Sequence, residues 1–373
     1  MKMQCIPNWN AKALEDVAMF EIRWARASDR PQILLLLREI FGDETALLAE
    51  KRWQWQWVED PRLLQPGYKG FVIEWQGFLI ASIAMIPAGL YLHGSPIDAF
   101  WFAESFVHRK RLGRALRKMR ADGLSYPGSD FSNGLIGAIL NQPECPKHQL
   151  GKHLTEAATV SCYKVGSFDQ NGTGSWTRLI SLKGLLRAYI GHIPGWIFGS
   201  FLDFFMNWLP KPVYQAELFS GLFDARFDRL WLEALQSHHA ITRRDSAYLN
   251  WRYRKNPDTT YQTLTISEGE SLMGYVVYSV FERHGQPRAH ILDLLALSDD
   301  HAVLSSLMLC CIQRLRDEGV TKLECYTGSS AIVSVLRSLR FSQRLQKGKP
   351  HSTLVRSIHV DELYITRGDG DGG

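Results

Sequence analysis

The sequence predicts an α/β protein made of two similar units, each with a mixed sheet of the α+β kind and crossover helices. The reason is that the same order of predicted strands and helices occurs twice along the chain. Residues 55–61 read WQWVEDP and residues 251–257 read WRYRKNP, so both fit the pattern W-[QR]-[WY]-x-[EK]-[DN]-P. The length of 373 residues is long for one core and comfortable for two. Trp is abundant in this chain, so chance similarity is the alternative. The shared order of the elements after each motif favours a duplication.

After the first motif, residues 70–86 read GFVIEWQGFLIASIAMI, which predicts two strands joined by a tight turn at Gln76-Gly77. Residues 99–107 (AFWFAESFV) predict a central strand that carries Glu104. A helix is expected over residues 112–121 and a further strand over residues 134–140.

After the second motif, residues 263–280 predict another hairpin, with its turn near Glu268-Gly269. Residues 289–297 (AHILDLLAL) predict a central strand that carries Asp293, which we expect to be structural. A helix over residues 301–319 and a strand over residues 322–327 complete the same order.

The expected boundaries are an N-terminal unit over residues 1–165, a linker and apolar helical connector over 166–220, and a C-terminal unit over 221–373. The linker opens with GSFDQNGTGS, a flexible composition. Residues 193–209 (IPGWIFGSFLDFFMNWL) form the apolar connector, which we expect to be buried as a helix between the units. Weak contact with a membrane surface and a bilayer span are the alternatives. The ending RGDGDGG is expected to be a frayed tail.

Composition excludes several classes of protein. Hydrophobic residues make up 45% and charged residues 22%, as in ordinary globular proteins, and the net charge of +5 is too small to indicate nucleic acid. The six cysteines include no CxxC pair and no set with zinc spacing, so we expect reduced thiols and no metal. The first twenty residues contain no apolar core of signal-peptide length, which predicts a cytoplasmic protein.

The stretch ESFVHRKRLGRAL (104–116) has the strongest chemical character. A strand ends here, a short basic loop with a glycine follows, and a helix begins. That arrangement points backbone N–H groups and a helix N-terminus at one place, which suits a pyrophosphate. The alternatives for this basic run are a solvated helix face and nucleic acid.

This stretch resembles the signature [QR]-x-x-G-x-[GA] of the GNAT N-acetyltransferase superfamily, with matches at Lys110, Gly113 and Ala115. The resemblance covers most of residues 20–165 and 223–345, and it implies acetyl-CoA or another acyl-CoA as co-substrate. Residues 244–253 and 334–341 resemble bacterial tandem GNAT-like proteins, some of them associated with polysaccharide or glycoconjugate pathways. The cofactor-binding residues that it implies are Val107, Lys110, Arg111, Leu112, Gly113, Arg114, Ala115 and Asn141.

The resemblance also implies catalytic roles. Glu104 lies where a general base often sits, and Tyr163 follows the last strand of the first copy, where it would protonate the departing thiolate. The alternatives are an ion pair of Glu104 with Arg109 or Arg111, and a core position for Tyr163. Trp53, Trp55 and Trp57 are expected to pack in the core; lining an acceptor pocket is the alternative.

Three departures from the superfamily pattern stand out, and the third limits the site to the first copy. Lys110 stands where Arg or Gln is usual, and the loop is short after His108. In the second copy the corresponding loop reads SDDH (298–301), which is acidic and would repel a pyrophosphate. We therefore expect the N-terminal copy to bind the donor and the C-terminal copy to be a degenerate lid or acceptor-binding half.

The sequence thus predicts an acyltransferase, foremost an N-acetyltransferase, acting on an amine or hydroxyl of a small molecule, sugar or glycoconjugate. The alternative is a non-catalytic GNAT-like module that binds a glycan or a protein.

Overall fold

A computed structural model describes residues 20–64, 66–121, 148–150, 174–181, 209–343 and 363–369. The chain forms two compact units. The N-terminal unit comprises Met1–Gly89, Ile97–Gly166 and Ser352–His359. The C-terminal unit comprises Leu90–Pro96, Ser167–His351 and Val360–Gly373. Each unit is described by itself below.

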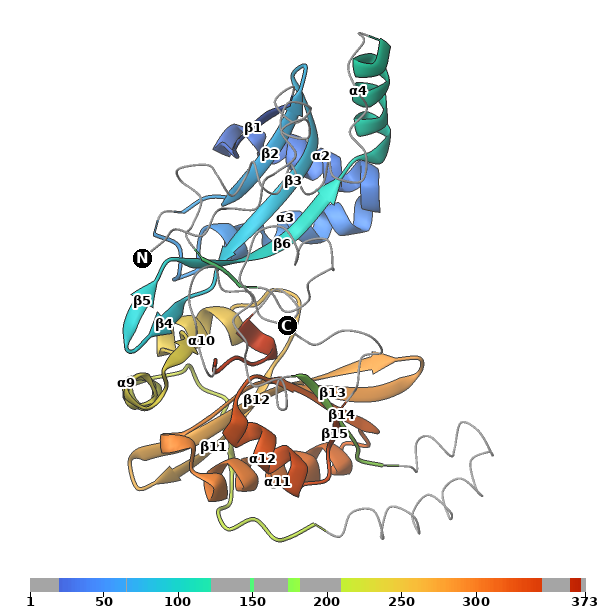
Figure 1. Cartoon of the computed structure of the whole chain (residues 1–373). Coiled ribbons are helices and arrows are strands. Elements are labelled where there is room, and N and C mark those ends of the chain that lie inside the picture. The colour runs from blue at the N-terminus through green and yellow to red at the C-terminus, as the bar shows by residue number, and fades with distance from the viewer. Residues whose placement is uncertain are drawn as a thin grey trace, which may run out of the picture. The chain divides into compact units, whose positions relative to one another are not determined.

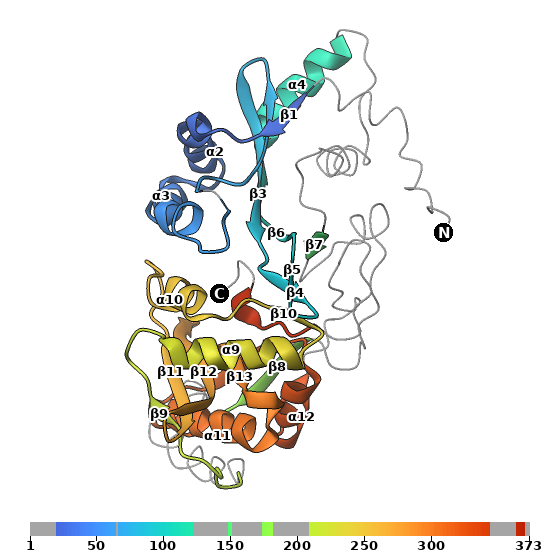
Figure 2. The same ribbon diagram turned by 90° about the vertical axis from the view of Figure 1, so that its left-hand side faces the viewer.

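The N-terminal unit is built on a mixed sheet of strand order β1-β2-β3-β6-β7 (Figure 1 and Figure 2). Its strands are β1 (Glu21–Trp24), β2 (Gly70–Trp75), β3 (Phe78–Pro87), β6 (Ala99–Val107) and β7 (His148–Leu150). The predicted hairpin is β2–β3, and Gln76 and Gly77 both have positive φ, as a tight two-residue turn requires. Strand β6 pairs antiparallel with β3 and parallel with β7.

Helices pack on both faces of this sheet. After the 3-10 turn η1 (Ala27–Asp29), the helices are α2 (Arg30–Phe41), α3 (Asp43–Trp57) and α4 (Arg109–Ala121). Figure 2 shows α2 and α3 on one side of β3, where Leu36 and Trp57 pack against Leu79. Ala115 of α4 belongs to a separate cluster with Ile80, the neighbour of Leu79 in β3. Because neighbouring strand residues face opposite sides, α4 covers the other face.

The C-terminal unit is built on a larger mixed sheet of strand order β15-β8-β14-β13-β12-β11-β9. These strands are β8 (Gly174–Leu179), β9 (Glu217–Leu218), β11 (Gln262–Glu268), β12 (Ser271–Arg283), β13 (Gln286–Ala296), β14 (Lys322–Thr327) and β15 (Ser342–Gln343). A small sheet of order β10-β4-β5 joins β10 (Ala240–Thr242), β4 (Leu90–Leu92) and β5 (Ser95–Ile97).

The helices of this unit again pack on both sheet faces. They are α9 (Ala225–Ser237), α10 (Ser246–Tyr253), α11 (His301–Asp317) and α12 (Ser330–Ser338), with 3-10 turns η2 (Leu297–Asp299) and η3 (Arg367–Asp369). The ring of Tyr275 in β12 lies 5.5 Å from that of Phe227 in α9. A Cβ on the preceding Gly274 would lie 3.0 Å from Val303 of α11. Because successive strand residues alternate faces, α9 and α11 lie on opposite sides of β12.

The two copies of the tryptophan motif have the same local structure. Each lies at the end of a helix that precedes a hairpin, since α3 ends at Trp57 and α10 at Tyr253. The acidic or amide residue near the end of each motif then forms the same turn. Asp60 accepts a hydrogen bond from the backbone of Arg62 at 2.9 Å, and Asn256 accepts one from Asp258 at 2.9 Å. The motif therefore contains a helix end followed by a turn that a short Asp or Asn side chain closes.

Two parts of the chain differ from the predicted boundaries. Gly174–Leu179, predicted as linker, is strand β8 and pairs antiparallel with β14. The Gly and Ser content concealed an alternation that buries Trp176 and Arg178. Leu90–Leu92, predicted in the N-terminal unit, pairs with β10 in the C-terminal unit. The boundaries at 165 and 220 themselves remain predictions.

The apolar connector 193–209 lies outside the described residues except for Leu209. Among the described residues, no helix is long and apolar enough to cross a bilayer. The same residues contain no cluster of His, Cys, Asp or Glu that could hold a metal ion.

Candidate functional site

Strand β6 of the N-terminal unit contains a β-bulge at the predicted catalytic carboxylate. Its register with β3 pairs Ala84 with Ala103 and Ser82 with Phe106, so Ile83 alone faces Glu104 and Ser105. A bulge of this kind bends a strand and redirects its side chains, and bulges are common beside active sites. The backbone of Glu104 is described, whereas its side chain lies outside the described part of the structure.

His108 lies between the last residue of β6, Val107, and the first residue of α4, Arg109. The backbone N–H of Arg111 donates to Nδ1 of His108 at 3.2 Å, and the N–H of Leu112 donates to its carbonyl at 3.0 Å. The imidazole therefore caps the helix, which satisfies an N–H group that would otherwise lack a partner inside the helix. With Nδ1 as acceptor, the ring proton is on Nε2, and Nε2 lies 3.0 Å from Oε2 of Glu39.

Arg111 is held by two neighbouring elements. One guanidinium nitrogen donates to the carbonyl of Leu79 at 2.8 Å, and the other lies 2.7 Å from Glu39. This side chain therefore joins β3, α2 and α4. Its guanidinium is already used in protein contacts, which weakens its predicted role in binding a pyrophosphate.

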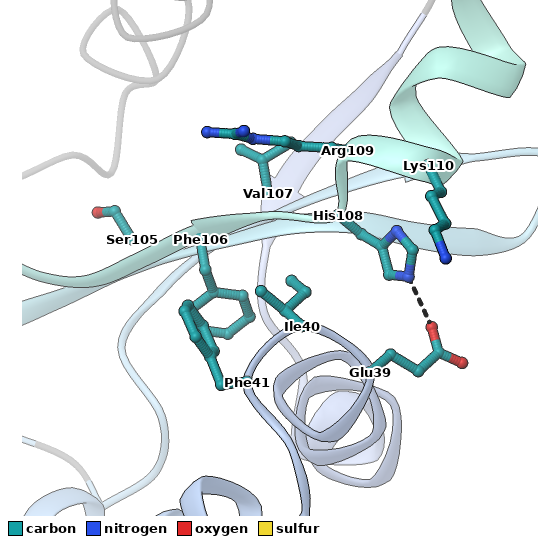
Figure 3. A pocket seen from close by; sticks show the side chains of 9 residues that line it. All are labelled: Glu39, Ile40, Phe41, Ser105, Phe106, Val107, His108, Arg109 and Lys110. Atoms are coloured by element: carbon teal, nitrogen blue, oxygen red, sulfur yellow. Dashed lines mark ion pairs between the residues drawn. The ribbon is translucent and has the colours of Figure 1, made fainter.

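A pocket of about 600 Å³ lies at this end of β6 (Figure 3). It is lined by Ser105, Phe106 and Val107 of β6, by the end of α2 and by the first turn of α4. Arg109 and Lys110 are exposed and line it. We call it the donor pocket, because the sequence predicts the acyl-CoA donor at this stretch of the chain. An adjoining pocket of about 500 Å³ shares Lys110 with it and also contacts Arg114.

The structure places the predicted site residues in two groups. Val107, Lys110, Arg111 and Arg114 line these pockets. The predicted basic loop with a glycine is wrong, because α4 already begins at Arg109 and Leu112, Gly113 and Ala115 lie inside it. Leu112 and Ala115 pack against the sheet core. Asn141 and Tyr163 lie outside the described residues. The roles assigned to all of them remain predictions.

Sequence reasoning missed Glu39 and Phe41, which come from α2 and line the donor pocket. Neither residue lies in a motif, and only tertiary packing brings them to β6. It also did not single out Ser105 or His108, although both stand inside the stretch ESFVHRKRLGRAL. Two signals in the sequence could have identified them: Ser105 directly follows the predicted strand carboxylate Glu104, and His108 directly precedes the basic helix.

The corresponding strand of the C-terminal unit, β13, is also bulged at its carboxylate. Val277 pairs with Asp293 and Tyr278 with Ile291, so Leu292 is the extra residue. The parallel pairing of β13 with β14 ends at Ile291 and Cys325, although both strands continue. Each unit therefore has a bulged central strand with an antiparallel and a parallel neighbour.

The C-terminal segment Leu363–Asp369 lies where β13 and β14 part. Gly328 donates its N–H to Ile365 at 2.9 Å, Thr327 bridges to Thr366, and the Tyr364 hydroxyl donates to the carbonyl of Leu294. Asp369 is 3% exposed. The expectation of a frayed tail is therefore wrong for Arg367–Asp369, because buried partners hold this segment in the sheet.

A buried ionic cluster fixes that segment. Arg244 lies 3.0 Å from Asp293 and 2.7 Å from Asp369, and its side chain is fully buried. The hydroxyl of Tyr275 donates to the second oxygen of Asp293 at 2.9 Å. Burial raises the pKa of the Asp293 carboxyl, and the Arg244 guanidinium opposes that rise. These contacts support the expectation that Asp293 is structural.

The acidic loop of the C-terminal unit caps its own helix. The Asp300 carboxylate accepts from the backbone N–H groups of Ala302 and Val303 at 2.7 and 3.1 Å. The first turn of α11, where a pyrophosphate would bind in a donor site, thus already holds an anion.

The tryptophans before the first hairpin lie in α3. Trp53, Trp55 and Trp57 are 9%, 8% and 2% exposed, and Trp53 and Trp57 pack in the core under the sheet. The expectation of core packing is therefore confirmed for these two residues.

No family model matches the chain, and no curated protein matches it in sequence. Several solved structures share its fold. A GCN5-related N-acetyltransferase from Anabaena variabilis aligns with 90% of this chain and 72% of its own, at 13% identity and a TM-score of 0.52. A probable N-acyltransferase of unknown function from Enterococcus faecalis aligns over the same shares, at 10% identity and a TM-score of 0.57.

The N-myristoyltransferase of Saccharomyces cerevisiae, solved with bound myristoyl-CoA, aligns with 91% of this chain and 78% of its own. The identity is 10% and the TM-score 0.51. At such identities the likeness is one of fold. It confirms the mixed α+β fold class and the resemblance to the GNAT superfamily at the level of fold.

Proposed function

We propose, from the GNAT fold of this chain, that it is an acyl-CoA-dependent acyltransferase whose donor site is the pocket at the end of β6. One observation carries the proposal: a bulged central strand runs directly into the N-terminus of a basic helix, at a pocket lined by Arg109 and Lys110. The helix start and the two cations suit the pyrophosphate of CoA. The solved structures of similar fold include a GCN5-related N-acetyltransferase, a probable N-acyltransferase and an N-myristoyltransferase with bound myristoyl-CoA.

In this proposal the acyl group passes directly from CoA to the acceptor. The acceptor nitrogen or oxygen attacks the thioester carbon, the new C–N or C–O bond forms, and the C–S bond breaks. Glu104 accepts the proton that the acceptor loses, directly or through water, and the CoA thiolate takes a proton, for which Tyr163 is the proposed donor. A backbone N–H near the bulge of β6 polarises the carbonyl.

The acceptor is proposed to be an amine or hydroxyl of a small molecule, sugar or glycoconjugate. The C-terminal unit is proposed to supply acceptor contacts rather than a second donor site. Two observations support this division. Leu363–Asp369 lies between the parting strands β13 and β14, and Asp300 caps the first turn of α11.

A second candidate is a non-catalytic module that binds a glycan or a protein. It is favoured by the contacts of Arg111, whose guanidinium and backbone N–H both have partners within the protein. These contacts leave fewer free donors for a pyrophosphate than a loop of the superfamily pattern would offer.

Binding of CoA tests the proposal. We expect acetyl-CoA or CoA to raise the melting temperature, since a ligand at 100 times its Kd stabilises the folded state by about 2.7 kcal/mol. Arg109→Ala with Lys110→Ala should weaken binding at least tenfold in calorimetry. Arg117→Ala is the matched control, because Arg117 is an exposed basic residue of the same helix outside both pockets. Absence of any CoA binding would favour the non-catalytic module.

Measurement of turnover tests the proposed role of Glu104 as the general base. If Glu104 accepts the acceptor proton, Glu104→Gln should lower kcat by about 100-fold or more and leave CoA affinity nearly intact. An equal loss of CoA affinity and of folding would instead assign Glu104 a structural role.

A further inference from the structure

A second, apolar hollow adjoins the donor pocket. It has a volume of about 240 Å³ and lies between α2, α3 and the bulged part of β6. We call it the apolar groove. Its lining is mainly apolar, with Leu37, Phe41, Leu48, Ala49 and Phe106, and it also includes Thr45, Ser105 and the charged Arg52.

The apolar groove and the donor pocket adjoin each other. Both are lined by Phe41, Ser105 and Phe106. The rings of Phe41 and Phe106 lie 6.2 Å apart, edge to face, at the junction (Figure 3). The cations Arg109 and Lys110 lie only at the donor-pocket end. The donor-pocket end is therefore basic, whereas the groove end is lined mainly by apolar side chains, with Arg52 as its one charged lining residue.

The apolar groove leaves hydrophobic surface uncovered. Phe41 is 55% exposed and Leu48 is 41% exposed, although both face a hollow rather than a flat surface. Covering such side chains with another apolar group is favourable. The groove thus offers a binding energy that an acetyl group is too short to use.

We propose that the donor is an acyl-CoA with a chain longer than acetyl, and that the chain lies in the apolar groove. This inference rests on the proposed function. With the pyrophosphate at Arg109 and Lys110, the pantetheine follows β6 toward the bulge. The thioester then lies near Ser105, where the two hollows meet, and the chain continues between α2 and α3.

A chain-length series tests this occupant without an acceptor. The affinities of acetyl-CoA, butyryl-CoA and hexanoyl-CoA are measured by calorimetry on the whole chain. A buried methylene contributes about 0.8 kcal/mol, so each should tighten binding about fourfold. By the same constant, hexanoyl-CoA should bind at most roughly two-hundredfold more tightly than acetyl-CoA.

Two variants test where the acyl chain binds. Thr45 is exposed and lines the apolar groove, so Thr45→Trp fills it from the rim and should abolish the dependence on chain length. Leu47→Trp is the matched control, because Leu47 is 59% exposed on the same helix and does not line the groove. Leu47→Trp should keep the full dependence of binding affinity on acyl-chain length.

The outcomes separate this inference from the proposed function. Tight acetyl-CoA binding with no gain for longer chains would overturn the inference and leave the proposed function standing. A dependence that survives Thr45→Trp would overturn it as well, since the chain would then lie elsewhere. If chain length has no effect but Thr45→Trp raises the KM of an acceptor, the groove holds the acceptor and the inference is wrong. No binding of any CoA ester would overturn both proposals.

Discussion

The imidazole of His108 lies 3.0 Å from the carboxylate of Glu39, and this pair joins the end of β6 to the end of α2. The other ring nitrogen caps α4. The His108 side chain therefore links three features: the end of β6, the start of the basic helix α4, and Glu39, the acidic group that lines the donor pocket. Glu39 also lies 2.7 Å from Arg111, so it offsets part of the positive charge of that pocket.

Glu39→Gln should tighten CoA binding about fivefold at low salt, because it removes a negative charge close to the proposed pyrophosphate position; about 1 kcal/mol is typical for such a charge near a surface. Calorimetry at two ionic strengths checks this, and the gain should shrink at high salt. Glu44→Gln, an exposed acid of α3 outside the pocket, should change little. Weaker binding in Glu39→Gln would mean that the carboxylate acts by positioning His108 and Arg111.

Gly113→Ala should separate helix stability from ligand binding. Gly113 lies inside α4, and a Cβ there would meet nothing closer than the guanidinium of Arg117 at 3.9 Å. Ala is favoured over Gly in a helix interior by up to about 1 kcal/mol, so urea unfolding should show a more stable protein. CoA affinity should fall if the pyrophosphate approaches this backbone closely. Unchanged affinity would remove Gly113 from the cofactor-binding residues.

Arg244→Ala should destabilise the C-terminal unit by about 3–5 kcal/mol, because it leaves two buried carboxylates without their cation. Hydrogen exchange at Leu363–Asp369 should accelerate in this variant, since Asp369 loses its partner. Arg226→Ala is the control: its ion pair with Asp224 is 36% and 46% exposed, and such pairs contribute little. Equal effects of the two variants would contradict the account of the buried cluster.

Glu324→Gln should destabilise the protein at neutral pH and not in strong acid. Hydrogen bonds from His290 and then Lys322 lower the pKa of Glu324 to about 2. Because this folded-state pKa lies below the ordinary value of 4.5, the ionised carboxylate stabilises the fold above pH 4.5. That contribution is lost as the pH falls from about 4.5 toward 2. Urea unfolding of both proteins from pH 7 to pH 2 should show a difference of about 1–3 kcal/mol that disappears in this window. A difference independent of pH would indicate lost packing instead.

The sequence by itself determined the local elements. The hairpin at Gln76-Gly77 follows from two β-favouring runs around a turn with positive φ. The strands Ala99–Val107 and Lys322–Thr327 have the predicted bounds. The two tryptophan motifs mark equivalent helix ends, because a helix stop and a turn closed by Asp or Asn depend only on neighbouring residues. In these places the local preferences of the chain and the folded structure agree.

Only the tertiary structure decided which residues far apart in the sequence contact one another. Glu39 reaches His108 and Arg111 only because α2 packs on the sheet beside β6. Gly174–Leu179 has a linker composition and became strand β8, because β14 offered an edge that buries Trp176. Arg367–Asp369 has the composition of a loose tail and is held by Arg244, a contact across 125 residues. The physical reason is common to all three: pairing and burial between remote segments add energies that no short stretch of sequence contains.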